Sequence, residues 1–596
     1  MPRLTRTHRL ALYGGFSALI YFVGLGAPAL WEPDEGRYAE IARAMAVGGD
    51  YVTPRDDGVR YLEKPPLLYW SEALAIRALG RNEFAVRVPS ALASAGSVVV
   101  TAAAAELMLG SAVCLLAALA LGLSPLFFLF ARAATPDPEL AFFFSAALIA
   151  FYAAAGRDFR SGEGRCLMIT AAALTALATL VKGPVALVLE GAIALLWLVG
   201  EGRWREAARI RWPECVAVYL ALAVPWFVFA ARRNPGFVEF FFMHEHLQRF
   251  VSDTEHGWGP WFFAAVAVFG TWPFFYFVPS GIAALASRAT GSESFVRRSA
   301  LRFLLLWFAV VILFFSVPRS KLAEYLLPGL PPLAILAAAG LDLIPRMEPH
   351  SAWRLVRGFA TINVTIAIGG FAMMGLLRYL GKPPTGAAFA WFNAPNASAA
   401  MVSDASLLLV CIGVVSVVLW VQALRWGRSP AGTPIRRMPY AVALLALLIV
   451  AALGKARSDA TPIFSYRPLA QAIAPRLEQG CVMASYHHFV QGLPFYTGHQ
   501  EQLVGYRGEL APFGDSPDAA GVFIASDARL QQAWSSPSCM ILIVNRGDWA
   551  RLATVLKPPP SLVACEGKKV AITNQDRGVL APLEAGACGG ASAPRN

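Results

Sequence analysis

About thirteen apolar runs follow one another through the first 455 residues of the chain. An α-helix needs about 20 apolar residues to cross a bilayer, so each run predicts one membrane-spanning helix. The predicted spans lie near 10–30, 84–109, 111–131, 137–156, 166–181, 183–200, 213–232, 260–285, 301–317, 322–340, 355–379, 404–424 and 438–454. The chain has 57% hydrophobic and only 15% charged residues, with a mean hydropathy of +0.52. It is therefore predicted to be a polytopic α-helical membrane protein.

The basic residues between these runs predict the orientation of the chain. Cytoplasmic loops of membrane proteins are enriched in Lys and Arg. Alternate loops here carry arginine clusters at 157–165, 203–211, 288–302, 346–354 and 425–437. We therefore place the N-terminus in the cytoplasm and interpret its basic stretch as the start of a retained signal anchor. An odd number of spans then sends the C-terminal segment to the outer side, the periplasm or the cell exterior.

The segment 456–596 is less apolar and predicts a soluble domain. VMASYHHF (482–489), GVFIASDA (521–528), MILIVNRG (540–547) and KKVAITN (569–575) have the composition of strands, and 465–477 and 527–534 that of helices. Strands alternating with helices indicate a small α/β domain. Cys481, Cys539, Cys565 and Cys588 predict one or two disulfides in an oxidising compartment, with the pairing left open. The chain thus divides into a membrane domain (1–455), with amphipathic juxtamembrane helices in the loop 31–83, and a C-terminal domain (456–596).

The loop 31–83 opens with WEPDEGRYAEIARAM, which places two acidic residues at the rim of the first span. Charge at that depth is costly and usually has a function. Asp34 and Glu35 are therefore candidate catalytic residues. The alternative for Asp34 is a structural one, an N-cap of a helix predicted over 36–47, because Asp is a favoured N-cap residue.

The same loop contains YLEKPPLLYW, in which Glu63 and Lys64 precede two prolines. Two prolines stop a helix and fix an extended backbone, so they would hold a carboxylate and an ammonium in defined positions. The alternative is that Glu63 and Lys64 only solvate a loop.

Other outward-facing loops add charged side chains to the same face. They contribute Asp137 between two prolines, His244, His246 and Arg249 in FFMHEHLQRF, Arg319 and Lys321 with Tyr325, and Lys182 after a span. The histidine pair is a weak metal signal, since the spacing fixes no third ligand. The net charge of +12 fits a protein that meets anionic lipids or phosphates, and the chain has no Gly-rich phosphate loop, so no nucleotide is expected.

These motifs resemble the aminoarabinose transferases of the bacterial inner membrane, a family of lipid-linked glycosyltransferases of the GT-C class related to protein O-mannosyltransferases. The resemblance is carried by PDEGRYAEIARAM with YLEKPPLLYW, by FFMHEHLQRF followed by GPWFF (259–263), and by SKLAEYLLPGLPPLAIL (320–336). It covers roughly residues 10–455, and the tail resembles the family's periplasmic domain only in size and position. It implies a GT-C fold, an inner-membrane location, a periplasmic active site and a monomer among membrane lipids, with no nucleic-acid partner.

The resemblance also implies an activity and site residues. The family moves 4-amino-4-deoxy-L-arabinose from undecaprenyl phosphate to phosphate groups of lipid A, which confers resistance to polymyxin and cationic antimicrobial peptides. The expected roles in this chain are catalysis for Asp34, Glu35 and Asp137, substrate binding for Lys64, Arg249, Tyr325, Arg37 and Tyr38, and binding of a divalent metal, with zinc the expected ion, for Glu63 and His244.

Two other activities are compatible with parts of the pattern. A protein O-mannosyltransferase-like enzyme would share the acidic pair but accept a hydroxyl, which needs a general base. A lipid transporter or flippase would place charge near the bilayer midplane in matching halves, whereas the charges here lie at the outer ends of spans. A receptor that uses the tail as a binding module would leave the loop motifs without a function.

Overall fold

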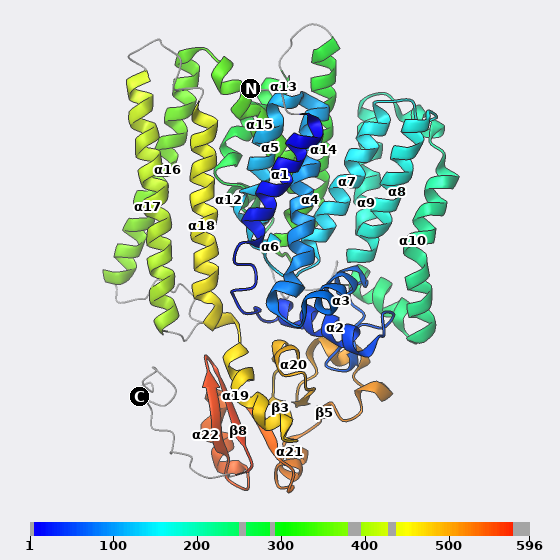
Figure 1. The fold of residues 1–596 in the computed structure, drawn as a ribbon, viewed down its shortest axis with the longest axis vertical. Helices are drawn as coiled ribbons and strands as arrows, with labels where there is room; N and C mark the ends of the chain where they lie inside the picture. The colour runs from blue at the N-terminus through cyan, green and yellow to red at the C-terminus, as the bar shows by residue number, and fades with distance from the viewer. Residues whose placement is uncertain (1–4, 249–257, 287–291, 380–394, 427–436, 576–596) are drawn as a thin grey trace.

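A computed structural model describes residues 5–248, 258–286, 292–379, 395–426 and 437–575. It has a helical membrane domain and a smaller α/β domain that covers one end of the helical bundle (Figure 1). The helices of the bundle are α1 (Arg6–Phe22), α4 (Glu83–Leu109), α5 (Ser111–Gly122), α6 (Pro125–Ala131), α7 (Asp137–Ala155), α8 (Gly162–Lys182), α9 (Val185–Gly200), α10 (Trp212–Arg233), α12 (Phe262–Gly270), α13 (Val278–Ala286), α14 (Ser292–Ser316), α15 (Leu330–Leu343), α16 (Pro349–Tyr379), α17 (Pro395–Trp426) and α18 (Met438–Phe464).

Each of the thirteen predicted spans has a helix or a bent pair of helices at its position. Among the described residues, eight helices are long and apolar enough to cross a membrane, and two bent pairs raise that number to ten. The other three predicted spans correspond to α1 and α9, which are shorter, and to α17, part of which lies outside the described side chains. The membrane fold is confirmed, and the number thirteen stays a prediction.

Two predicted spans, 111–131 and 260–285, are bent pairs. The helices α5 and α6 meet at 65° where Pro125 begins the second helix. The second pair bends by 98° at a break that includes Pro273. A proline has no backbone N–H and clashes with the preceding turn, so it ends or kinks a helix inside an apolar run.

The loop after α1 forms a plate between the bundle and the C-terminal domain (Figure 1). It contains α2 (Asp34–Gly48), a hairpin of β1 (Arg55–Asp56) and β2 (Val59–Arg60), and α3 (Leu67–Leu79). The predicted juxtamembrane helix over 36–47 is therefore confirmed as α2, which ends at Gly49 in the left-handed conformation typical of a C-cap.

The C-terminal domain contains a six-stranded sheet with the order β5-β4-β3-β6-β8-β7. Its strands are β3 (Val482–Tyr486), β4 (Glu501–Val504), β5 (Phe523–Ile524), β6 (Met540–Asn545), β7 (Ser561–Glu566) and β8 (Lys569–Thr573), and its helices are α19 (Arg467–Glu478), α20 (Gly492–Thr497), α21 (Asp527–Trp534) and α22 (Arg546–Val555). The first four strands in the order are parallel, and β8 is antiparallel to both its neighbours. The α/β prediction is confirmed, although β4 and β7 were not predicted.

The boundary and the cysteines of this domain differ in detail from the prediction. The helix α18 continues to Phe464, so the domain begins at Ser465 rather than at 456. A disulfide joins Cys481 and Cys539 at the entrances to the neighbouring strands β3 and β6. Cys565 is also disulfide-bonded, and Cys588 lies outside the described residues.

The C-terminal domain contacts the plate through a close approach of two glycines. A Cβ on Gly36 of α2 would lie 2.7 Å from the backbone nitrogen of Gly492, the first residue of α20. The Gly492 N–H also donates a hydrogen bond of 2.7 Å to Glu32. The two helices therefore meet at backbone distance, which only glycine permits.

Gly36→Ala is expected to push α20 away from α2 and to destabilise the docked domain by about 1–3 kcal/mol, because the clash is with backbone atoms. Thermal unfolding and limited proteolysis of the C-terminal domain measure this effect. Gly48→Ala is the matched control, since a Cβ there meets nothing within 4 Å. Equal melting temperatures for both variants would contradict the close approach.

A second contact between plate and domain buries two carboxyl groups. Asp57 and Gly58 form the turn of the β1–β2 hairpin with positive φ angles of 51° and 83°, and this turn brings Asp57 against β4. The Glu501 N–H donates a hydrogen bond of 2.8 Å to Asp57, and Glu501 also bonds Ser485. Burial raises the pKa of Glu501 to about 8, and burial followed by the charge of Glu501 raises the pKa of Asp57 well above its usual range.

Protonation of this pair makes the stability of the docked domain depend on pH. An unfolded Glu loses its proton near pH ~4.3, whereas the folded chain keeps it to about 8, so this contribution is complete below ~4.3 and is lost as pH rises through about 8. We expect the free energy of unfolding to fall by about 1.4 kcal/mol per pH unit for each such proton between about pH 6 and 8. Glu501→Gln should flatten this slope, and exposed Glu478→Gln should not. A pH-independent melting temperature in the unmodified chain would contradict the prediction.

Candidate active site

One cavity of about 350 Å³ lies where the plate, the bundle and the C-terminal domain meet. Its size is that of a small-molecule site. It brings together seven of the ten predicted site residues, namely Asp34, Arg37, Tyr38, Glu63, Lys64, Asp137 and Tyr325. The remaining lining residues are Pro33, Pro136, Lys182, Val185, Glu245, Phe314, Phe315, Pro318, Ser320, Leu322, Glu324 and Glu509.

Asp34 presents its carboxylate to this cavity. It is the first residue of α2, its side chain is 51% exposed, and it lies 3.6 Å from Arg37 Nη1. The N-cap of α2 is Pro33, and Asp34 makes no capping hydrogen bond. The structural alternative for Asp34, the N-cap, is therefore wrong, and the carboxylate remains exposed to a ligand.

Glu35 points away from the cavity and into the protein. Its side chain is buried between the guanidinium groups of Arg87 and Arg457, with oxygen–nitrogen distances of 2.8 and 2.9 Å, and accepts a hydrogen bond from the Ala134 N–H. Burial alone would raise the pKa of Glu35, but the two guanidinium groups outweigh it and lower that pKa to about 2. The structure thus separates Glu35 from the cavity and makes it the junction of α2, α4 and α18, which holds Asp34 in place.

Arg37 links the cavity wall to the C-terminal domain. It forms an ion pair of 2.7 Å with Glu509, which lies in a short 3-10 helix of that domain (Gly508–Phe513). It also donates a hydrogen bond of 3.3 Å to the Tyr61 hydroxyl, which in turn donates one of 2.8 Å to Glu63. Four side chains from three segments are therefore connected across one wall.

Lys64 lies near the same Glu63 oxygen that accepts the Tyr61 hydrogen bond. Its ammonium is 3.8 Å from a Glu63 oxygen and 3.7 Å from a Glu245 oxygen, which are longer than hydrogen bonds. Glu63 is buried, so the alternative of a solvated loop is wrong. Because the ion contacts of Lys64 are long, a phosphate can bind its ammonium without breaking a short hydrogen bond. Lys64 is therefore the cation of the cavity best suited to bind a phosphate.

Asp137 and Lys182 form an ion pair at the ends of two bundle helices. Asp137 is the first residue of α7 and Lys182 the last of α8, and the Lys182 ammonium bonds the Asp137 carboxylate. The same ammonium lies 4.4 Å from the centre of the Tyr325 ring, a cation–π contact. Tyr38 adds a buried aromatic ring to the wall, whereas Tyr325 is half-buried.

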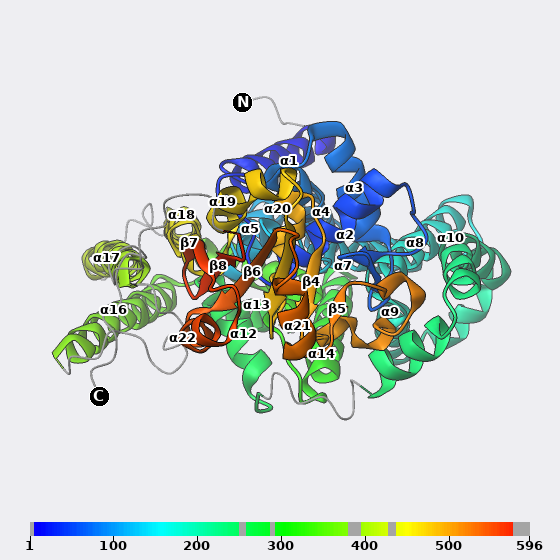
Figure 2. The same ribbon diagram turned by 90° about the horizontal axis from the view of Figure 1, so that it is seen from below.

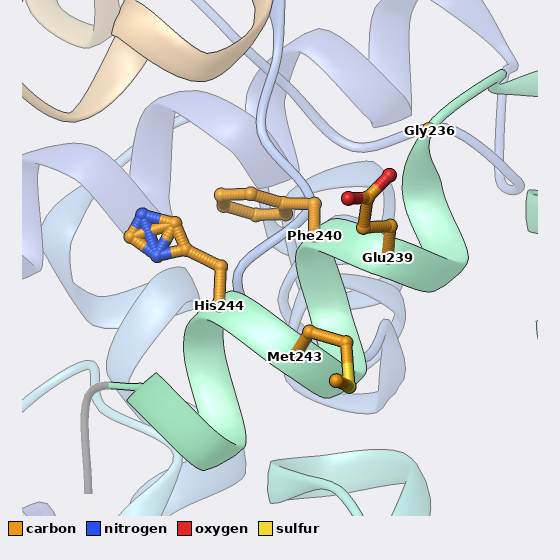
Figure 3. Close-up of a pocket in the computed structure, with 5 residues that line it drawn as sticks. All are labelled: Gly236, Glu239, Phe240, Met243 and His244. Carbon is orange, nitrogen blue, oxygen red and sulfur yellow. The ribbon is translucent and has the colours of Figure 1, made fainter. Parts of the chain in front are cut away.

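Besides Glu35, two predicted residues are not among the described residues that line this cavity. Arg249 lies outside the described residues. His244 lines a separate hollow of about 280 Å³ with Gly236, Glu239, Phe240 and Met243. Figure 3 shows the rings of His244 and Phe240 side by side on one helix, with the Glu239 carboxylate beyond Phe240.

The described side chains do not assemble the metal site that is expected at Glu63 and His244. Glu63 and His244 line different cavities, and Glu63 already accepts the Tyr61 hydrogen bond. Within the described ranges, no three His, Cys, Asp or Glu side chains come together as a metal-binding group. The metal stays a prediction of the resemblance, and we assign no step to it.

Lys182, Glu324 and Glu509 are lining residues to which no role was assigned from the sequence. Lys182 was visible as a basic residue on the outward side, where insertion does not require it. Glu509 had no local signal, because it reaches the cavity from a different domain. Only the docking of that domain brings it to Arg37.

Comparison with known proteins gives related matches over both domains. Residues 14–241 match the family model of the dolichyl-phosphate-mannose-protein mannosyltransferases, and residues 469–574 match the aminoarabinose transferase C-terminal domain. An undecaprenyl phosphate-alpha-4-amino-4-deoxy-L-arabinose arabinosyl transferase of Pseudomonas aeruginosa (strain LESB58) is 35% identical over 372 residues, which are 61% of this chain and 64% of the relative. One from Pseudomonas fluorescens (strain Pf0-1) is 32% identical over 64% of this chain and 67% of its own length.

A solved structure is similar over almost the whole chain. The crystal structure of ArnT from Cupriavidus metallidurans bound to undecaprenyl phosphate has a TM-score of 0.79 and 26% identity, and covers 96% of this chain and 99% of that chain. The structure of the same protein in the apo state gives a TM-score of 0.77. The two proteins are therefore similar in the fold of each domain and in how the two domains are arranged.

Proposed function

This chain belongs to the family of the undecaprenyl phosphate-α-4-amino-4-deoxy-L-arabinose arabinosyl transferases, and we propose that it moves 4-amino-4-deoxy-L-arabinose from undecaprenyl phosphate to a phosphate group of lipid A. Its aligned region spans just under two thirds, 64%, of the P. aeruginosa relative. The observation that carries the proposal is one cavity, at the end of the bundle that the plate covers. In this cavity Lys64, Arg37 and Lys182 lie among carboxylates.

The chemistry of the proposed transfer fits these side chains. An oxygen of the acceptor phosphate attacks C1 of the sugar, the bond from C1 to the undecaprenyl phosphate oxygen breaks, and the leaving phosphate keeps the electron pair. An in-line attack inverts the configuration at C1. Lys64 is placed to stabilise the charge of the leaving phosphate, and Arg37 adds a second positive charge to the wall.

Asp34 is proposed to act without removing a proton. The acceptor is a phosphate monoester with a second pKa near ~6, so at neutral pH it is already a nucleophile. The exposed carboxylate of Asp34 orients it or stabilises positive charge developing at C1. Asp137, bonded to Lys182, holds that ammonium in the cavity as a further positive charge.

The proposed orientation follows the arginine clusters. The N-terminus lies in the cytoplasm, and the cavity and the C-terminal domain face the periplasm of a bacterial inner membrane. Both substrates are then lipids of the same bilayer. The modification would lower the negative charge of lipid A and so reduce its affinity for polymyxin and other cationic peptides.

Mass spectrometry of lipid A tests the proposal. The chain is expressed in a polymyxin-sensitive Gram-negative host that makes undecaprenyl-linked aminoarabinose but lacks its own transferase. Lipid A carrying aminoarabinose, together with higher polymyxin resistance, is the expected result. Unmodified lipid A from a well-expressed, folded chain would overturn the acceptor assignment, and glycosylated periplasmic proteins would then indicate a mannosyltransferase-like hydroxyl acceptor.

A further inference from the structure

The charges that line the active-site cavity are not balanced. Six carboxyl groups and three cationic groups face it among the described residues. Arg37 contacts Glu509 and Asp34, Lys64 contacts Glu63 and Glu245, and Lys182 contacts Asp137. In the part of the chain that the structure describes, Glu324 is the only one of the six without an ion pair.

Glu324 lies close to the proposed chemistry. It is in the 3-10 helix Ala323–Gly329, directly before Tyr325, and its side chain is half-buried. The charged groups that act on its carboxyl are Asp137, Lys182 and Asp34. The single ammonium of Lys182 is already bonded to Asp137, and Asp34 faces Arg37, so Glu324 has no cation of its own among the described residues.

A site of this kind favours a ligand that brings its own positive charge. Carboxylates that face one another in a partly buried cavity repel, and a bound ammonium relieves the repulsion while forming charge-assisted hydrogen bonds. A primary amine at C4 of a sugar is protonated at neutral pH, as an amino group in a protein is. The pentose ring separates C4 from C1, so the amine and the phosphate need opposite charges at different places in the cavity.

We propose that Glu324 binds the C4 ammonium of the donor sugar and thereby selects an amino sugar over a neutral one. This assignment rests on the proposed function. Glu324 then lies at the ammonium end of the donor and Lys64 at the phosphate end. Asp34 and Glu509 are less suited to this contact, because each already faces the guanidinium of Arg37, at 3.6 and 2.7 Å.

The test compares two donors that differ only in charge at C4. Undecaprenyl phosphate linked to 4-amino-4-deoxy-L-arabinose is compared with undecaprenyl phosphate linked to L-arabinose, which has a hydroxyl at that carbon. The ratio of kcat/KM for the two donors, and the ratio of their Kd values, are measured with purified protein in lipid nanodiscs. Glu324→Gln should reduce the preference for the amino donor roughly 10- to 100-fold in both kcat/KM and Kd, as expected for the loss of a charged hydrogen bond.

Two further variants keep the result interpretable. Glu324→Asp retains the carboxylate and should keep most of the preference for the amino donor. Glu163→Gln removes a carboxylate that is 76% exposed on α8 and pairs with Arg157, and should leave both ratios unchanged. A general loss of folding would change the melting temperature and the binding of both donors equally.

The possible outcomes separate this inference from the proposed function. A Glu324→Gln variant that keeps the unmodified chain's ratios of kcat/KM and Kd overturns the role of Glu324, even when transfer occurs. If the unmodified chain transfers neither sugar to lipid A, the acceptor assignment fails. The Kd ratio then decides the role of Glu324 by itself. If the unmodified chain binds the amino donor more tightly and Glu324→Gln loses this preference, the role is supported. If the unmodified chain and Glu324→Gln have the same Kd ratio, the role is overturned.

Discussion

Asp34→Asn is expected to lower the rate of sugar transfer by about 100-fold or more while leaving the fold intact. The asparagine keeps the shape of the side chain at the start of α2 but removes the charge that faces the cavity. Loss of one preorganised electrostatic contact to a transition state typically costs 10²–10³ in kcat. Because the carboxylate is half exposed and caps no helix, the free energy of unfolding should change by only about 0.5 kcal/mol.

Single-turnover transfer from the aminoarabinose donor, together with a melting curve, measures both parts of this prediction. Asp515→Asn serves as the control, since that carboxylate is 83% exposed on the C-terminal domain and pairs with Arg507. If Asp34→Asn retained near-normal transfer, its charge would play no part in the reaction. The position of Asp34 in the cavity would then need another explanation.

Arg87→Met is expected to produce the largest loss of stability. Arg87 is fully buried, binds both oxygens of Glu35, and donates hydrogen bonds to the carbonyl oxygens of Leu25, Pro28 and Ala29. Methionine fills a similar volume but leaves Glu35 with Arg457 as its remaining cation. Removing one partner of a buried ion pair costs about 3–5 kcal/mol, because the remaining charge stays buried.

Differential scanning calorimetry in detergent should show this loss as a lower melting temperature. Arg165→Met breaks an ion pair with Glu214 whose arginine is 48% exposed, and should cost at most about 1 kcal/mol. The double variant Glu35→Gln with Arg87→Met should lose less than the sum of the single changes, since both partners are then uncharged. Equal losses for Arg87→Met and Arg165→Met would show that the buried cluster does not hold the plate on the bundle.

Glu35 and Asp34 show why neighbouring acidic residues are difficult to assign from sequence. Both were expected to be catalytic. On a helix, successive side chains point about 100° apart, so one lines the cavity and the other is buried against Arg87 and Arg457. Those two arginines lie far from Glu35 along the chain, and no local spacing predicts that they meet.

The sequence by itself determined the membrane fold, the α/β class of the C-terminal domain and seven of the 19 residues that line the cavity. Hydropathy and charge are properties of each segment alone. Apolar segments enter the bilayer as spans and charged segments stay outside it as loops. The same logic identified Asp34, Lys64 and Asp137, since charged residues at the ends of apolar runs have few structural reasons to be there.

Only the tertiary structure decided which charges face each other. Glu509 reaches Arg37 because a separate domain docks on the plate, and Glu324 stands apart because its neighbours are already paired. The bends at Pro125 and Pro273 and the contact of Gly36 with Gly492 likewise arise from packing. Ion pairs and close backbone contacts depend on distances between segments that are remote in sequence. The periodicity and composition of each segment do not determine those distances.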